Sequence, residues 1–246
     1  MDRLIYTALT GVDAAMNRQR AVANNLANVS TPGFRAETFS VSNLRLRSES
    51  LDVRGLAQGA VRGADMSAGT VMQTGRTLDV ALGGDALMAL QAADGSEVYT
   101  RRGDLRIEPD GRLLNGDGLA VMAEAGPLVV PPGWAISIAQ DGGVYAADPA
   151  APDVPAELVG RIKLANPAGS PLVKGLDNVL RVPGGGILPA DPTATLVTGA
   201  LEGSNVDTAA TLVDMIEAQR SFERRTKLLS TAEQLDQSST RLMSLS

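Results

Sequence analysis

The stretch DGRLLNGDG, residues 110–118, gathers carboxylate and amide oxygens, which are the ligands that Ca²⁺ prefers. The spacing does not match a calcium site, because Val121 stands where an EF-hand loop beginning at Asp110 would carry its closing glutamate. No glycine-rich nonapeptide repeats either. Asp-Gly and Asn-Gly are also the pairs that type I′ hairpin turns prefer. We therefore predict hairpin turns here and no metal site.

Catalytic designs built on histidine or cysteine are excluded, because the chain contains neither residue. Gly184, Gly185 and Gly186 do not form a phosphate loop, since no Lys-Ser or Lys-Thr pair follows at the required spacing. The remaining serines and carboxylates show no pairing that marks a nucleophile or a general acid. The sequence predicts no catalytic residues, no cofactor and no enzymatic activity. The alternative, a hydrolase that uses carboxylates, would need a concave site with convergent acids.

The composition of the chain indicates a folded protein and excludes several classes of partner and location. Of 246 residues, 44% are hydrophobic and 20% charged, enough to bury a core in one or two domains. The formal net charge of −6 has the wrong sign for binding phosphate backbones, so nucleic acid is excluded as a partner. The N-terminal segment has no uninterrupted apolar run, which predicts neither a cleavable signal nor a membrane span.

The first element that could position functional residues is a helix predicted over residues 3–29. Its apolar residues recur with a helical period and fit a heptad frame. One core position holds Ile5, Val12 and Leu26, with Gln19 as the exception, and the other holds Ala8, Ala15, Val22 and Val29. Few of these side chains are large, so the helix needs a partner surface.

A second helix is predicted from about Val206 onward. Ser204 and Asn205 are suitable N-cap residues, and Asp207 suits the positive end of the helix dipole. Residues three or four apart then form a stripe: Leu212, Ile216, Gln219, Phe222, Leu229, Ala232, Leu235, Ser239 and Leu242. The two helices could pair within one chain as an intramolecular coiled coil, or pack between subunits.

Between the helices the apolar period changes to two, as in Leu78, Val80 and Leu82, and Asp-Gly and Asn-Gly pairs punctuate the runs. This predicts an α+β fold with a central all-β, hairpin-rich domain over residues 70–190. We assign residues 1–34 to an N-terminal helix and turn and residues 205–246 to a C-terminal helix, the two pairing as a coiled coil. Residues 35–69 and 191–204 are predicted to be extended connectors.

One motif stays unexplained by helix and turn propensities alone: ANNLANVSTPGF, residues 23–34. Pro32-Gly33 suits the centre of a type II turn that ends the helix before Phe34 anchors the chain. Asn24, Asn25 and Asn28 place three carboxamides around Leu26, where hydrogen bonds between helices would fix register.

This motif resembles the N-terminal signature of the flagellar rod and hook axial proteins. The resemblance continues in order at TLDVAL (77–82), DGSEVYTRRGDLRIEPDGRL (94–113), EAGPLVVP (124–131) and LEGSNVD (201–207). The opening MDRLIYTALTG and the segment ALEGSNVD are most similar to a proximal rod subunit. One departure is Ala86 and Leu87, where the family commonly has aromatic residues; we expect the strand to persist.

The resemblance implies a structural subunit of the proximal rod of the flagellar basal body, which transmits torque for motility. Its terminal helices would form the inner coiled-coil layer of a helical tube, with the β-domain outside. The implied partners are further copies, other rod and hook axial proteins, and the flagellar type III export apparatus that delivers the chain to the periplasm. No small-molecule substrate or membrane insertion is implied. Another axial paralogue, such as the distal rod protein, and a non-flagellar coiled-coil adaptor are the alternatives.

The residues predicted to lie in subunit interfaces come from both helices and from the motif between them. They are Ile5, Val12, Asn24, Asn25, Leu26, Asn28, Phe34, Leu212, Ile216, Phe222, Leu229 and Leu235.

Overall fold

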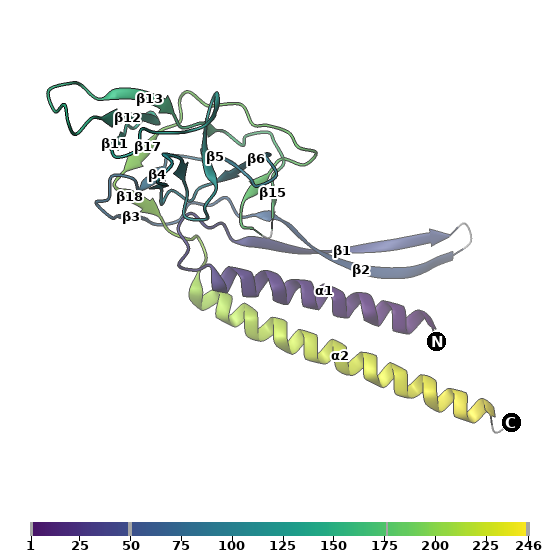
Figure 1. The fold of residues 1–246 in the computed structure, drawn as a ribbon. Coiled ribbons are helices and arrows are strands. Elements are labelled where there is room, and N and C mark those ends of the chain that lie inside the picture. Colours follow the sequence, from purple (N-terminus) through teal and green to yellow (C-terminus); the bar gives the residue numbers. More distant parts are fainter. Residues whose placement is uncertain (1, 49–50, 176, 245–246) are drawn as a thin grey trace. The chain divides into compact units, whose positions relative to one another are not determined.

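The computed structural model of the chain describes residues 2–48, 51–175 and 177–244, and within these it contains two helices and eighteen strands (Figure 1). The predicted α+β class is confirmed. The chain forms two compact units. The terminal unit comprises Met1–Ala27, Glu37–Gly63 and Asp207–Ser246, and the central unit comprises Asn28–Ala36 and Ala64–Val206.

Two helices from opposite ends of the chain pack together in the terminal unit: α1 (Asp2–Ala27) and α2 (Thr208–Ser244). They run antiparallel, as Figure 1 shows, and Arg18 of α1 lies 3.5 Å from Asp214 and 3.7 Å from Glu217 of α2. Within residues 8–27, where the burial of α1 is described, the buried residues are small, namely Gly11, Ala14, Ala15, Ala21 and Val22. Such side chains allow close approach of the two helices, but each buries little apolar area.

The N-terminus of α2 differs from the prediction. Asp207 is the cap, because its Oδ1 accepts a hydrogen bond of 3.0 Å from the Ala210 N–H. Ser204 and Asn205 lie before the helix, and the side chain of Asn205 bonds elsewhere.

Residues 35–69, predicted to be an extended connector, contain two long strands, β1 (Glu37–Ser48) and β2 (Leu51–Ala64). They pair with each other in a two-stranded sheet. Pairing between two backbones needs no alternation of apolar and polar side chains, which is why the sequence pattern did not reveal it.

The central unit is built from short strands, and most of its buried apolar residues belong to one core that includes Leu90, Leu105, Leu113 and Val121. Its main sheet has the order β15-β16-β6-β5-β9-β8-β7, with β10 on β9 and β14 on β5. The strands are β3 (Val71–Gln73), β4 (Val80–Leu82), β5 (Leu87–Gln91), β6 (Glu97–Thr100), β7 (Arg106–Ile107), β8 (Leu113–Leu114), β9 (Ala120–Ala123), β10 (Gly126–Pro127), β11 (Ala135–Ile138), β12 (Gly143–Ala147), β13 (Glu157–Arg161), β14 (Leu164–Ala165), β15 (Val173–Lys174), β16 (Leu180–Arg181), β17 (Leu196–Thr198) and β18 (Ala200–Glu202).

This unit is wider than the predicted range of 70–190, because segments near both chain ends belong to it. Residues 191–204, predicted to be a connector, supply β17, which pairs with β4, and β18, which pairs with β3. Strand β5 begins at Leu87, so the strand at the Ala86 and Leu87 departure persists. Both residues are buried.

The Asp-Gly pairs do form hairpin turns, but the turn type differs from the prediction. At residues 92–95 the Gly95 N–H donates to the Ala92 carbonyl oxygen, so glycine is the fourth residue of the turn and not a central one. Gly95 has a φ of 84°, whereas Asp94 has a negative φ. Type I′ turns need positive φ at both central residues, so this is a type I turn followed by a left-handed glycine. Gly111, Gly118 and Gly142 repeat the pattern.

Candidate functional site

The second part of the ANNLANVSTPGF motif, residues 28–34, follows α1 and reverses the chain within the central unit. The Phe34 N–H donates to the Thr31 carbonyl oxygen over 3.3 Å, and Gly33 has a φ of 66°, as the predicted turn at Pro32-Gly33 requires. The Gly33 N–H also donates to the Glu202 carbonyl oxygen over 2.7 Å. A Cβ at Gly33 would lie 2.3 Å from the Arg101 carbonyl carbon, so the N-terminal turn sits directly on the backbone of Arg101.

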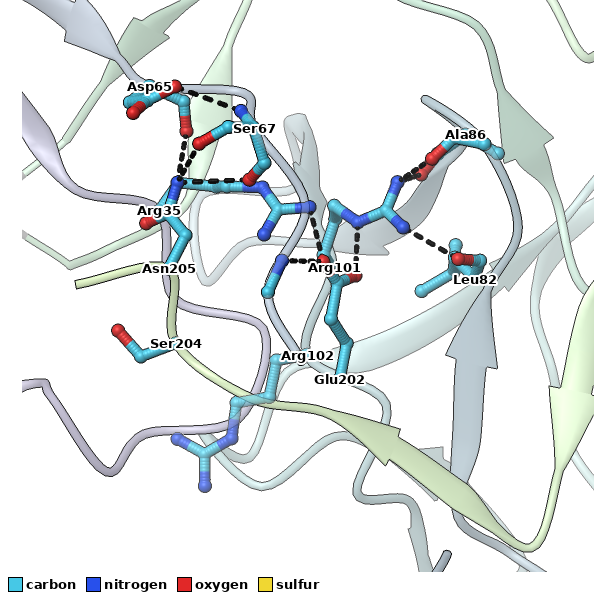
Figure 2. Close-up of polar contacts among 12 residues, drawn as sticks. Arg35, Asp65, Ser67, Leu82, Ala86, Arg101, Arg102, Glu202, Ser204 and Asn205 are labelled. Atoms are coloured by element: carbon cyan, nitrogen blue, oxygen red, sulfur yellow. Dashed lines mark hydrogen bonds and ion pairs between the residues drawn. The ribbon is translucent and has the colours of Figure 1, made fainter. Parts of the chain in front are cut away.

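Behind this turn lies a buried cluster of three charged side chains, Arg35, Arg101 and Glu202, shown in Figure 2. Glu202 Oε1 accepts a hydrogen bond of 2.7 Å from Arg35 Nη2, and Oε2 accepts one of 2.6 Å from Arg101 Nε. All three side chains are at most 3% exposed. The three residues lie in different segments of the chain, so the cluster joins the residue after the N-terminal motif, β18 and the loop after β6.

The two arginines differ in how well they are satisfied. Arg101 also donates to the carbonyl oxygens of Leu82, Gly84 and Ala86 at 2.6–2.8 Å, so neutral acceptors surround its charge. Arg35 has only its Nη2 bonded to Glu202, and its Nε and Nη1 are buried without a hydrogen-bond partner. The guanidinium of Arg35 therefore relies on Glu202 for its hydrogen bonding more than the guanidinium of Arg101 does.

The electrostatics of the cluster favour an ionised Glu202. Burial alone would raise the pKa of this carboxyl, but hydrogen bonds from the Gly69 N–H, Arg101 and Arg35 outweigh burial and lower the pKa below its usual value. Burial lowers the pKa of Arg35, although the hydrogen bond from Arg35 to Glu202 opposes this shift. Two guanidinium groups thus share one carboxylate.

Asn205 ties three further segments of the central unit together (Figure 2). Its Oδ1 accepts a hydrogen bond of 2.7 Å from the Ala36 N–H, and its Nδ2 donates to the carbonyl oxygens of Asp65 and Ser67 at 2.8 and 3.0 Å. The Asn205 N–H donates to the Phe34 carbonyl oxygen as well. The ends of the segments 28–36, 64–69 and 200–206 are therefore held to one another by a single amide side chain.

Phe34 is buried, as the prediction of an anchor required, and it packs inside the central unit. The ammonium of Lys174 lies 3.3 Å from the centroid of the Phe34 ring and donates a hydrogen bond of 2.7 Å to the Arg35 carbonyl oxygen. Phe34 thus helps to join residues 28–36 to β15 within the central unit.

The three asparagines expected to bond between helices make hydrogen bonds within the chain. Asn24 donates to a carboxylate oxygen of Glu37, and Asn25 exchanges two hydrogen bonds with the Glu37 backbone. The side-chain oxygen of Asn28 accepts hydrogen bonds from Thr31 and Asn178. The reversal at Pro32-Gly33 returns the chain to the end of α1, which brings Glu37 close to Asn24 and Asn25.

The predicted interface residues on the helices fall into two groups. Val12, Leu26, Phe222 and Leu229 are half-buried, whereas Leu212 and Ile216 are 47% and 52% exposed. The side chains of Ile5 and Leu235 lie outside the described residues. Among the described side chains of α2, the buried ones are Thr211, Ala218 and Ala232, so Leu212 and Ile216 point away from the buried face.

Sequence reasoning missed Arg35, Arg101 and Glu202 and misassigned Asn205 to a helix cap. Arg35, Arg101 and Glu202 are more than 60 positions apart along the chain and meet only through the fold, so no local spacing marks them. The available signal was that Arg101, Glu202 and Asn205 lie inside the blocks that resemble the axial family, and that Arg35 directly follows one.

Comparison with known proteins identifies these same blocks. Residues 5–35 match the family described as flagella basal body rod protein. Residues 81–146 match the flagellar hook protein FlgE/F/G D1 domain, and residues 197–242 match the C-terminal region of the flagellar basal body rod FlgEFG proteins.

Full-length relatives decide the family. The chain is 41% identical to the flagellar basal-body rod protein FlgF of Escherichia coli and 38% identical to that of Salmonella typhimurium, with 100% of each chain covered. The chain belongs to the FlgF family of flagellar basal-body rod proteins. A rod protein FlgG, from Agrobacterium fabrum, is 32% identical over 95% of this chain and 96% of the relative. The protein is therefore a structural component of the basal-body rod and not an enzyme.

The part of the chain that the structure describes bears on two further possibilities, a membrane-spanning helix and a metal site formed by carboxylates. There, no helix is both long and apolar enough to cross a membrane. The same residues contain no group of three or more Asp or Glu placed to hold a metal ion. The carboxylates of the Asp-Gly turns face arginines, with Asp110 bonded to Arg112 and Asp117 to Arg102, each over 2.6 Å.

Proposed function

We propose that this rod subunit assembles helically through outward faces of α1 and α2 and transmits torque through those contacts. The observation that carries the proposal is that each helix has apolar residues on more than one face. α1 and α2 bury a face of small residues, yet Leu9 is 44% exposed and Leu212, Val213 and Ile216 are 47–57% exposed. These large apolar side chains gain free energy only when another surface covers them.

The positions of these residues suit packing between helices. On α2, Val213 and Ile216 are three residues apart, so they lie on one face, while Ala218 lies on the buried face. On α1, Leu9 is followed by the half-buried Val12 and Met16 at helical spacing. A coiled coil between subunits would use the outward faces of α1 and α2. The placement of Ile5 and Leu235 in this interface remains a prediction.

The proposed partners are further copies of this chain and other axial proteins of the rod and hook. A contact between the outward face of α1 on one subunit and that of α2 on the next joins two different surfaces. Repeated contacts of this kind build an open helical assembly, as a rod needs. Delivery to the periplasm through the flagellar type III export apparatus belongs to the same proposal.

Site-specific cross-linking tests this proposal, and the chain contains no cysteine that would interfere. A photoreactive group attached to Ile216→Cys in isolated basal bodies should join this subunit to an axial neighbour. The same group attached to Asp153→Cys, an exposed residue of the central unit, is the control for non-specific labelling. If Ile216→Cys gives no more cross-linked product than Asp153→Cys, the proposed face of α2 does not contact another subunit.

A further inference from the structure

The central unit takes its closing segment from residues 196–205, near the C-terminal end of the chain. Strand β17 pairs with β4 and β18 pairs with β3, and Leu196 and Ala200 of these strands are buried. Without this segment, β3 and β4 would lose these backbone partners. The unit that begins at Asn28 is therefore completed by residues that lie about 170 positions later in the sequence.

Glu202 is the charged residue that this segment brings into the core. Among the described residues it is the only carboxylate in an ion pair with Arg35 or Arg101. Both arginines come from earlier segments, and both are 3% exposed once the unit is closed. Asp65 also attracts Arg35 electrostatically, but it is a weaker influence than Glu202. Before Glu202 is in place, closing the unit would bury two guanidinium groups without their ion-paired carboxylate, which is strongly unfavourable.

Of the two arginines, Arg35 has the greater need for the carboxylate of Glu202. The Nε and Nη1 atoms of Arg35 have no hydrogen-bond partner, so Glu202 is the only acceptor for its side chain among the described residues. Lys174, which lies beside the Arg35 backbone, adds a third cation to the same region. Arg101 is different, because three carbonyl oxygens accept hydrogen bonds from it in addition to the carboxylate.

We infer that Glu202 acts as an anionic latch: the central unit stays open until the carboxylate of Glu202 reaches Arg35 and Arg101. The charges of the two arginines, and not only the missing strands, keep the earlier part of the chain from closing. This conformational role rests on the proposed function in one respect, since a subunit that threads through an export channel must remain open during passage. The latch itself is a property of the single chain.

The test uses the full-length monomer and measures cleavage by thermolysin between residues 64 and 206. Glu202→Gln keeps the shape of the side chain and removes its charge. Cleavage should become about 100-fold faster or more, because losing one partner of a buried ion pair raises the open population by that order. Glu108→Gln, which removes a carboxylate from a partly exposed ion pair with Arg112, is the control and should leave the rate nearly unchanged.

A second variant tests whether the unpaired charge of Arg35 causes the faster cleavage. Adding Arg35→Met to Glu202→Gln removes the arginine that has no other acceptor, while the glutamine side chain at position 202 still offers its amide oxygen to Arg101. The double variant should be cleaved at least about tenfold more slowly than Glu202→Gln alone. The latch is wrong if Glu202→Gln resists thermolysin like the natural chain, or if the double variant is cleaved as fast as the single one. Neither result depends on rod assembly, so failure of the latch and failure of the proposed function remain distinguishable.

Discussion

The side-chain oxygen of Asn205 accepts a hydrogen bond of 2.7 Å from the backbone N–H of Ala36, which is 169 residues earlier in the chain. Ala36 is the last residue of the N-terminal segment that enters the central unit, and Asn205 lies next to the last residue of the C-terminal segment that leaves it. The segments through which the chain enters and leaves the central unit are thus bonded to each other inside that unit.

Replacing Asn205 should weaken this junction. Asn205→Ala removes one acceptor for the Ala36 N–H and the donors to Asp65 and Ser67, so we expect a loss of about 2–3 kcal/mol in the free energy of unfolding. Urea titration of the monomer measures it. Asn166→Ala, which removes hydrogen bonds of an exposed asparagine to Asp191 and Ala168, is the control and should cost less than about 1 kcal/mol. Equal losses for the two variants would contradict the special role of Asn205.

The stability of the monomer should fall in acid partly through Glu202. Its pKa is lowered in the folded chain, so the unfolded chain takes up the proton first as the pH falls. The contribution of Glu202 is therefore complete above its ordinary pKa of 4.5 and is lost as the pH falls through the lower pKa of the folded state. Urea titrations at pH 7 and at about pH 3 should show that the stability difference between the natural chain and Glu202→Gln shrinks in acid. A difference that stays constant would show that ionisation of Glu202 does not stabilise the fold.

Two glycines with similar backbone conformations should respond differently to alanine. Gly33 has a φ of 66° and faces the Arg101 backbone at 2.3 Å from an added Cβ, whereas Gly75 has a φ of 73° and faces open space. Gly75→Ala should cost about 1 kcal/mol from backbone strain alone. Gly33→Ala should cost at least about 2 kcal/mol more, because backbone atoms must also move apart. Thermal unfolding of both variants measures the difference. Similar melting temperatures would mean that an added Cβ at Gly33 does not clash with the Arg101 backbone.

The sequence predicted the elements more reliably than the contacts between them. The N-terminal helix, the stop at Pro32-Gly33 and the hairpins at the Asp-Gly pairs depend on local patterns, and the structure contains all three, although the helix ends at Ala27 and not at Val29. The two-stranded sheet of β1 and β2 was missed because backbone pairing leaves no alternation in the sequence.

The junction could not be predicted from spacing, because Arg35, Arg101 and Glu202 are brought together by folding across the whole chain. The resemblance to the axial proteins did point to the correct segments, since Arg101, Glu202 and Asn205 all lie within the quoted blocks. It did not say which residues in those blocks touch. The predicted stripe on α2 mixed buried and outward residues, because two apolar faces on one helix overlap in a single periodic pattern.

The central claim, that outward apolar residues of the terminal helices build the rod, is tested most directly by Ile216→Asp as the only copy in the cell. Ile216 is 52% exposed in the subunit, so the aspartate should leave the unfolding free energy of the monomer within about 1 kcal/mol of its natural value. Ile216→Leu, which keeps an apolar side chain, is the matched control. We predict that Ile216→Asp cells are non-motile with truncated basal bodies and that Ile216→Leu cells swim. Normal swimming and complete basal bodies in Ile216→Asp cells would contradict the assembly role of this face.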